Sequence, residues 1–474
     1  MSTRTDHNQA LLTRLTITAA LGGLLFGYDT AVISGAVGAI KANFIAPRGL
    51  SEVAASGLAG WTISCALLGC AVGAGIAGSL SNRIGRRGGM LVAAVLFILS
   101  AVGSAFPEFG HGVVGGMGPA ALPWFIFYRL IGGVGIGLAS VLSPLYIAEI
   151  APADVRGRMV TYQQVAIVSG ITLVYFVNWA IAAQGDEVWV LAEGWRYMLL
   201  SGVIPAALFF VLLFGVPDSP RWLVLKNRAE EARAVLTRLT TASEADVILR
   251  EIEGTLVEKT RPLGSYGWTV IGVGLALSIF QQFVGINAVL YYAPQMFQNT
   301  GVSGNVALLQ TIVVGLVMTV FTLVALVTVD NWGRKPLLMI GAVGMAVSML
   351  ALGLLFASGS VGQWALVAVM VYIAAFSLSW GPVVWVMLAE IFPNAIKGKA
   401  MAIAVAAQWI SNLFVSATFE VMDGSTALNA WLNHGFAYFV YAGMSVLAAI
   451  FVWRFVPETK GRTLEAMEQL WQHR

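Results

Sequence analysis

Charged residues are scarce in this sequence. Only 11% of its 474 residues are Asp, Glu, Lys or Arg, whereas 58% are hydrophobic. A soluble globular domain carries about 25% charged residues, so this composition excludes a soluble enzyme or binding module. The apolar stretches are also too many and too long for a cleavable signal peptide followed by a soluble domain. The chain is therefore expected to reside in a lipid bilayer.

Cysteine and histidine are also rare, which limits the chemistry available. Cys65 and Cys70 lie in one apolar segment and would point to different faces of a helix, so both are expected to be small buried residues. The four histidines fall in loops or tails and form no ligand cluster. No GxxxxGK[ST] stretch occurs, which excludes nucleotide hydrolysis through a P-loop. We expect no enzymatic activity, no cofactor, no metal site and no nucleic-acid partner.

The apolar stretches predict an all-α polytopic membrane protein. A helix needs roughly 20 apolar residues to span a bilayer, and about twelve segments reach that length. Backbone in contact with lipid must satisfy its own hydrogen bonds, so these segments are predicted to be helices. The predicted spans are 13–40, 55–81, 88–106, 121–149, 159–184, 196–216, 266–297, 305–329, 337–357, 363–391, 398–421 and 432–456.

The placement of basic residues predicts the orientation. If both termini are cytoplasmic, the outer loops hold only Lys41, Arg48 and Arg196. The inner loops then hold Arg83, Arg86, Arg87, Arg156, Arg158, Arg334, Lys335, Lys397 and Lys399. Basic residues are enriched in cytoplasmic loops, so we expect cytoplasmic termini and a location in the bacterial inner membrane.

One long polar interruption and an internal repeat divide the chain. Residues 217–262 contain AEEARAVLTRL and EADVILREIEGTL, two patterns typical of amphipathic helices. On either side the halves look alike: NRIGRR corresponds to DNWGRK, and AEIAPADVRGRM corresponds to AEIFPNAIKGKA. We predict a six-helix bundle over 1–216, intracellular helices over 217–263, a second bundle over 264–456, and a cytoplasmic tail over 457–474.

An ordered set of motifs resembles the sugar porter family of the major facilitator superfamily, and most closely its bacterial D-xylose/proton symporters. The motifs are GGLLFGYDTAVISG, SNRIGRR, RLIGGVGIG, YIAEIAP, PDSPRWL, QQFVGINAVLYYAP, SWGPVVWV, AEIFPNAIKGKA and VPETKGRTLEAME. They cover nearly the whole chain. The resemblance implies two pseudo-symmetric six-helix bundles that move around a central site.

Two charges within the predicted spans suggest proton coupling. Asp29 lies 15 residues after Arg14, roughly 22 Å into span 1. Arg129 lies about eight residues into span 4, roughly 12 Å below the outer surface, so the two side chains could pair. Desolvation favours a protonated Asp29, whereas a nearby Arg129 favours the carboxylate. The alternative is a permanent structural ion pair. The resemblance agrees with a coupling role, but the xylose symporters carry a further acid where this chain has Gly202.

Amide and aromatic side chains predict the sugar site. Amides match hydroxyl groups, and Trp packs on the C–H faces of a sugar. On span 7, Gln282 and Asn287 could reach one ligand if the helix breaks near Gly285. With the resemblance, the candidate substrate-binding residues are Phe26, Gln164, Gln281, Gln282, Asn287, Tyr291, Gly381, Trp385, Gln408 and Trp409. Ile171 and Met318 replace polar residues of relatives, which leaves the sugar open between a pentose and a hexose.

Charged residues at the inner helix ends are candidates for an inner gate. The resemblance implies ion pairs between the halves that lock the inner side while the outer side is open. The candidate residues are Arg83, Arg86, Arg87, Glu149, Arg156, Arg334, Glu390 and Lys397.

The sequence thus predicts a monomeric proton-coupled monosaccharide symporter, for a D-xylose-like pentose or a hexose, that works by alternating access. Its partners are the sugar, the proton and the bilayer. An uncoupled sugar facilitator is the alternative, and a transporter-like sugar sensor is a more remote one.

Overall fold

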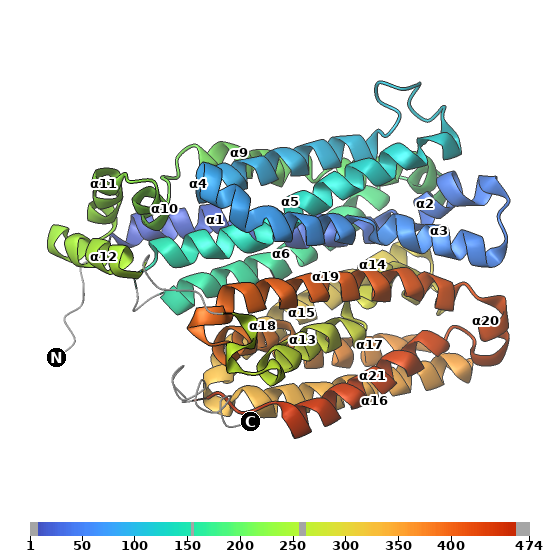
Figure 1. Cartoon of the computed structure of the whole chain (residues 1–474). Helices are drawn as coiled ribbons and strands as arrows, with labels where there is room; N and C mark the ends of the chain where they lie inside the picture. The colour runs from blue at the N-terminus through green and yellow to red at the C-terminus, as the bar shows by residue number, and fades with distance from the viewer. Residues whose placement is uncertain (1–7, 153–155, 256–261, 461–474) are drawn as a thin grey trace.

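The structure is a computed structural model that describes residues 8–152, 156–255 and 262–460, and this described part is helical (Figure 1). In the first half the elements are α1 (Gln9–Val32), η1 (Ile33–Gly35), α2 (Val37–Ile40), η2 (Lys41–Ile45), η3 (Ala46–Arg48), α3 (Glu52–Ser64), α4 (Ala66–Ala105), η4 (Gly118–Ala121), α5 (Leu122–Ile150), α6 (Arg156–Ala182), α7 (Glu187–Trp189), η5 (Val190–Gly194), α8 (Trp195–Leu200) and α9 (Val203–Leu213). They are followed by α10 (Pro220–Leu225), α11 (Ala229–Leu239), α12 (Ala242–Thr255), η6 (Leu263–Tyr266), α13 (Trp268–Phe283), α14 (Ile286–Gln298), α15 (Gly304–Trp332), α16 (Arg334–Ala357), α17 (Gly362–Leu378), α18 (Trp380–Ile391), α19 (Asn394–Asp423), α20 (Thr426–Leu432) and α21 (Phe436–Phe455).

These helices give twelve membrane crossings in the described part of the chain. Eleven segments are long and apolar enough to cross a bilayer. One of them, Glu52–Ala105, has 54 residues, more than twice the roughly 20 that a crossing needs. It breaks at Gly85, where φ is 85° and ψ is 167°, a conformation that glycine adopts without a steric penalty. The segment therefore crosses twice, and the predicted polytopic helical fold is confirmed.

The crossings form two groups, one from each side of the polar interruption (Figure 1). Within the first group, α4 packs along α5 and α1 along α6; within the second, α16 packs along α17 and α21. The groups meet where α6 lies against α15 and where α3 and α4 lie against α19. We refer to α1–α9 as the N-half and to α13–α21 as the C-half.

The two membrane faces differ in what they carry. α1 begins, α21 ends and α10–α12 stand at one face, which we refer to as the proximal face; α20 and the loop before α5 lie at the opposite, distal face (Figure 1). The sequence predicted two amphipathic helices in the polar segment, and the structure has three. The additional α10 begins at Ser219, whose hydroxyl accepts a hydrogen bond from the Trp222 backbone N–H, with Pro220 at the first helical position.

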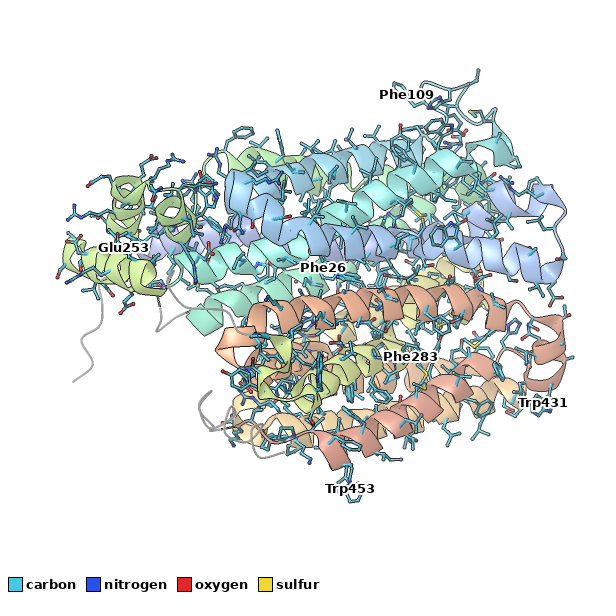
Figure 2. The ribbon with its side chains drawn as sticks, viewed as in Figure 1. Phe26, Phe109, Glu253, Phe283, Trp431 and Trp453 are labelled. Atoms are coloured by element: carbon cyan, nitrogen blue, oxygen red, sulfur yellow. The ribbon has the colours of Figure 1, made fainter. Side chains whose placement is uncertain are left out.

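Large aromatic side chains remain exposed on the C-half. Trp431 is 75% and Trp453 is 66% exposed, and Figure 2 shows Trp431 at the distal end and Trp453 on the outer side of this half. Tryptophan is enriched where a membrane protein meets the lipid headgroups. These positions therefore fit a helix bundle surrounded by lipid.

The expectation that Arg196 lies in an outer loop is wrong. Arg196 belongs to α8 and is 8% exposed. Its guanidinium donates to Glu108 at 2.7 Å and to the Ala105 carbonyl at 2.8 Å. Burial raises the pKa of Glu108, but hydrogen bonds from Arg196 and from backbone N–H groups lower it more, and the pKa ends below its ordinary value. The pair ties the loop after α4 to α8.

Candidate substrate and proton site

The predicted contact between Asp29 and Arg129 is present. Asp29 lies on α1 and Arg129 on α5, and the arginine Nη1 is 3.3 Å from both carboxylate oxygens. Its Nη2 donates to the Asp29 backbone carbonyl at 3.4 Å. The side chain of Arg129 is 3% exposed and that of Asp29 is 12% exposed. A buried charge of this kind persists only when it is paired and hydrogen-bonded, so each residue stabilises the other's ionised form.

Small residues leave room beside this pair. A methyl group at Gly132 would lie 3.5 Å from the Asp29 Oδ2. Ser100 on α4 is buried beside Gly132, and its hydroxyl has no hydrogen-bond partner in the structure, nor has the Nε of Arg129. Polar groups that are buried without a partner cost free energy. The surroundings of Asp29 can therefore accept a changed hydrogen-bond arrangement.

The predicted break in span 7 is also present. α13 ends at Phe283 and α14 begins at Ile286, and between them Gly285 has φ of 95° in the left-handed region. The break brings Asn287 back over the end of α13, where its Nδ2 donates to the Gln282 Oε1 at 2.5 Å. On a continuous helix these two side chains would lie about 140° apart. The glycine therefore makes one polar surface out of two helix faces.

Gln281 is the centre of a cluster of amides. Its Nε2 donates to the backbone carbonyls of Trp380 at 2.8 Å and Gly381 at 3.2 Å. Its Oε1 accepts from Gln282 at 3.4 Å and also from Gln408 on α19. Three helices of the C-half thus contribute to one hydrogen-bonded group. A sugar entering it would exchange these bonds for bonds to its own hydroxyls.

A second broken helix presents the carbonyls that Gln281 binds. α17 ends at Leu378 and α18 begins at Trp380, with Ser379 between them at φ −130° and ψ −87°. The sequence placed a kink or gate near Pro382, and the break lies just before it. Pro382 falls in the first turn of α18, where its missing N–H breaks no intrahelical bond. The predicted residue Trp385 follows on α18 and is half-buried.

The N-half contributes to the site through α1 and α6. Phe26 on α1 contacts Trp409 on α19, with ring centroids 5.5 Å apart, and Figure 2 shows Phe26 between the two halves. Gln164 is half-buried on α6. It shares a helix face with Tyr175, since eleven residues bring a helix back to within about 20°. Tyr175 donates to the Leu290 carbonyl on α14 at 2.8 Å, so this face looks toward the C-half.

Tyr291 links the two candidate sites. It lies on α14, is 2% exposed, and forms a side-chain hydrogen bond with Asn412. It also interacts electrostatically with both Asp29 and Arg129. The sequence grouped Tyr291 with the sugar-binding residues; the structure places it close to the charged pair as well. Asn412 was not predicted, although it follows Gln408 by one helical turn.

The positions that depart from relatives are apolar and buried. Ile171 and Met318 are each 5% exposed. Near them, the Thr172 and Thr319 hydroxyls lie 2.9 Å apart and join α6 to α15. At Gly202 an added methyl group would lie 3.9 Å from the ring of Tyr28, whose hydroxyl bonds the Ser201 hydroxyl at 2.7 Å. No acid replaces the missing carboxylate at that residue.

The predicted inner-gate residues lie at the proximal face, but their bonds run within each half. Arg86 donates to Glu149 at 2.8 Å inside the N-half, and Arg334 donates to Glu390 at 2.8 Å inside the C-half. Arg87 donates to the Leu213 carbonyl at 3.0 Å. The expected ion pairs between the halves are therefore not formed by these residues in this conformation. Arg83 is exposed and Lys397 half-buried, and the side chain of Arg156 lies outside the described part.

Polar bridges between the halves gather on the distal side of the described structure. Lys41 reaches Gln295 and Glu420 of the C-half. Glu52 accepts from the backbone and hydroxyl of Thr426 at 2.6 and 2.7 Å, and Glu187 accepts from the Gly304 backbone at 3.3 Å. The sequence reasoning missed these contacts, although Glu420 is an acid within predicted span 398–421. The distal ends of the halves are closed against each other.

Comparisons with known proteins are consistent along the whole chain. The family model described as sugar (and other) transporter matches residues 15–471. The chain is 51% identical to the D-xylose-proton symporter of Escherichia coli strain K12, with 99% of this chain and 97% of that protein covered. It is 46% identical to the glucose facilitated diffusion protein of Zymomonas mobilis, with 98% and 99% covered. A solved structure of the E. coli xylose transporter in an inward open conformation is 50% identical, with a TM-score of 0.88 and 97% of this chain and 100% of that chain covered.

Proposed function

This chain belongs to the sugar transporter family, and from that premise we propose that it is a proton-coupled monosaccharide symporter with D-xylose or a related sugar as its cargo. The single observation that carries the proposal is the buried ion pair of Asp29 and Arg129 beside a cluster of amides that can exchange partners. Ionisable residues inside a membrane usually serve a pathway or a coupling step. The protein is a multi-pass membrane protein and not an enzyme.

The sugar would bind between the halves, to the residues named from the sequence. Gln281, Gln282, Asn287 and Gln408 already form one hydrogen-bonded group, and each amide offers both donors and an acceptor for hydroxyl groups. Phe26 and Trp409 meet across the boundary between the halves and would pack on the C–H faces of the sugar. Gln164, Tyr291, Gly381 and Trp385 complete the proposed site.

Proton coupling would follow from a change in the distance between Asp29 and Arg129. While they lie 3.3 Å apart, the guanidinium favours the carboxylate. A movement that separates the two side chains removes that effect and leaves desolvation, which favours the protonated acid. Because Tyr291 lies on the broken helix α14 and interacts with both charges, movement of α14 around the sugar would change the surroundings of the pair.

Alternating access would be a rocking of the N-half against the C-half. The basic residues at the proximal face favour a cytoplasmic location for this face, with both termini in the cytoplasm of a bacterial cell. The distal closure then corresponds to an inward-facing state. In the opposite state, the inner-gate residues would exchange their bonds within each half for bonds between the halves. The proposed boundaries remain 1–216, 217–263, 264–456 and 457–474; of the tail, residues 461–474 lie outside the described part.

The test is proton movement in proteoliposomes that contain the purified protein. Addition of D-xylose outside should acidify the lumen, because each sugar enters with a proton. Asp29→Asn should abolish accumulation against a gradient while exchange of labelled sugar across the membrane continues. Full accumulation by Asp29→Asn would rule out the proton role of Asp29. Competition of labelled xylose uptake by glucose, galactose and arabinose would identify the cargo.

An uncoupled facilitator is the second candidate, and one observation favours it. A relative with 46% identity is described as a facilitated diffusion protein, and this chain has Gly202 where the xylose symporters carry a further acid. A facilitator would equilibrate xylose without acidifying the lumen. The same proteoliposome measurement therefore separates the two candidates.

A further inference from the structure

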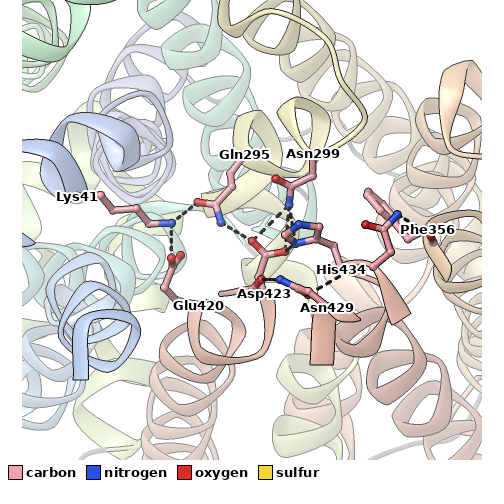
Figure 3. Close-up of polar contacts among 9 residues, drawn as sticks. Lys41, Gln295, Asn299, Phe356, Glu420, Asp423, Asn429 and His434 are labelled. Atoms are coloured by element: carbon pink, nitrogen blue, oxygen red, sulfur yellow. Dashed lines mark hydrogen bonds and ion pairs between the residues drawn. The ribbon is translucent and has the colours of Figure 1, made fainter. Parts of the chain in front are cut away.

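A chain of polar residues crosses the distal end of the molecule from one half to the other (Figure 3). All but one of its side chains belong to the C-half. The members, in order of contact, are Lys41, Glu420, Gln295, Asp423, Asn299, His434 and Asn429.

Lys41 is the member that comes from the N-half. It begins η2, the short turn that continues the first crossing, and its ammonium group contacts two acceptors of the C-half. One is the Gln295 Oε1 on α14, at 2.8 Å, and the other is the carboxylate of Glu420 on α19. The ammonium therefore joins the first crossing to the two C-half helices that also carry Asn287 and Gln408.

The acceptors of the C-half are held in place by Asp423. Its Oδ2 accepts from the Gln295 Nε2 at 2.6 Å, which leaves the Gln295 Oε1 facing Lys41. Asp423 is itself held by the Asn299 Nδ2 at 3.0 Å and by the His434 Nδ1 at 2.9 Å. The C-half thus presents a socket whose oxygens point at the ammonium group.

Burial makes the Glu420 charge dependent on Lys41. The Glu420 side chain is 4% exposed, and its second oxygen, Oε2, has no hydrogen-bond partner in the structure. Removing one partner of a buried pair leaves a charge without compensation. Beside the pair the two halves touch through their backbones: a methyl group at Gly60 on α3 would lie 2.3 Å from the Ala417 carbonyl on α19. The ion pair and this contact therefore belong to the same closed arrangement.

We propose that Lys41 and Glu420 form an ionic latch of the distal-closed state, seated in a socket that Gln295 and Asp423 position, and that this latch opens once in every transport cycle. The proposal rests on alternating access by the halves. When the distal side opens, Lys41 leaves the socket and water solvates Glu420 in its place. The latch thus sets how the carrier divides its time between its two states.

The test compares exchange at the two faces of the full-length protein in proteoliposomes, by hydrogen–deuterium exchange mass spectrometry. Lys41→Met should raise deuterium uptake at the distal ends of α3, α14 and α19 by on the order of tenfold, since a hydrogen bond to a charged group is lost. The same variant should lower uptake at the proximal ends of α5 and α18, because more molecules close there. Glu420→Gln should change both faces in the same directions, and Lys41→Arg should resemble the wild type.

The matched control is Arg48→Met. Arg48 is a distal cation a few residues after Lys41, and it donates to the carbonyls of Phe44 and Pro119 within its own half. This variant should leave both faces unchanged. A uniform rise in uptake at both faces of Lys41→Met and Glu420→Gln would mean a structural role and overturn the latch, as would no change at either face.

Counterflow of labelled D-xylose by the wild-type protein tests the proposed function separately. Absent counterflow would overturn sugar transport, whatever the exchange data say. Active counterflow with symmetric exchange changes would overturn the latch alone. If Lys41→Met does not fold, judged by size-exclusion chromatography, the isosteric variant Glu420→Gln decides between these outcomes.

Discussion

Asp29 and Arg129 show how far counting residues along a helix reaches. The rise of about 1.5 Å per residue places both at a similar depth, and the structure confirms the contact at 3.3 Å. The same counting does not say which way a side chain points around its helix. Arg196 was assigned to a loop by its position, whereas packing brings it inside to Glu108. Depth was predictable, and the direction of each side chain was not.

At the same scale, His434 should make stability depend on pH. Its hydrogen bond to Asp423 raises the pKa of His434 above its ordinary value of 6.5, although burial opposes this. A raised folded-state pKa stabilises the protein fully below the ordinary value, and the contribution is lost as pH rises through the folded-state pKa. His434→Gln should therefore lower the thermal unfolding midpoint by about 1–2 °C at pH 6, and by less at pH 9. A deficit that stayed constant from pH 6 to pH 9, measured by intrinsic fluorescence, would contradict this.

At the scale of elements, the sugar site depends on two broken helices. α13 and α14 separate at Gly285, and α17 and α18 separate at Ser379. Each break exposes backbone carbonyls or turns an amide toward the centre, which a continuous helix would not do. The motif QQFVGINAVLYYAP predicted the first break, because a glycine lies between two groups of polar residues. The second was expected near Pro382, but the proline lies inside the following helix.

Gly285→Ala should weaken sugar binding. Alanine in the left-handed region costs roughly 1–2 kcal/mol, and its methyl group would lie 2.6 Å from the Tyr441 ring. Relief of this strain would move α14 relative to α13 and pull Asn287 away from Gln282. We expect the KM for sugar to rise about tenfold or more, measured by uptake of labelled xylose. Gly272→Ala on α13, where a methyl group meets nothing within 4 Å, is the control and should keep the wild-type KM.

At the scale of the whole molecule, the two halves close against each other at the distal face. The contact of α3 with α19 is so tight at Gly60 that only a residue without a side chain fits. The ion pair of Lys41 and Glu420 lies at the same face. Closure of one face and opening of the other are the two parts of an alternating-access cycle, so residues at this contact control transport without touching the sugar.

Gly60→Leu should hold the carrier open at the distal face. Its side chain would collide with the Ala417 backbone, which cannot move aside as a flexible side chain would. Net uptake should fall by two orders of magnitude or more, while sugar binding from the distal side is retained. Isothermal titration calorimetry and uptake measured on the same preparation would check both. Gly57→Leu, one turn earlier on α3 with open space around it, should transport normally; equal loss in both variants would contradict the expectation.

The sequence by itself determined the membrane setting, the helical crossings, the repeated halves and the identity of the amides and charges available for a site. These follow from composition and from spacing along the chain, which the backbone geometry of a helix converts directly into length and depth. Only the tertiary structure decided that Arg86 pairs with Glu149 inside one half, that Gln281 joins three helices, and that Lys41 meets Glu420 across the distal face. Such contacts depend on how each helix is rotated and which neighbour it packs against. Packing among all the helices sets that rotation, and no single segment carries it.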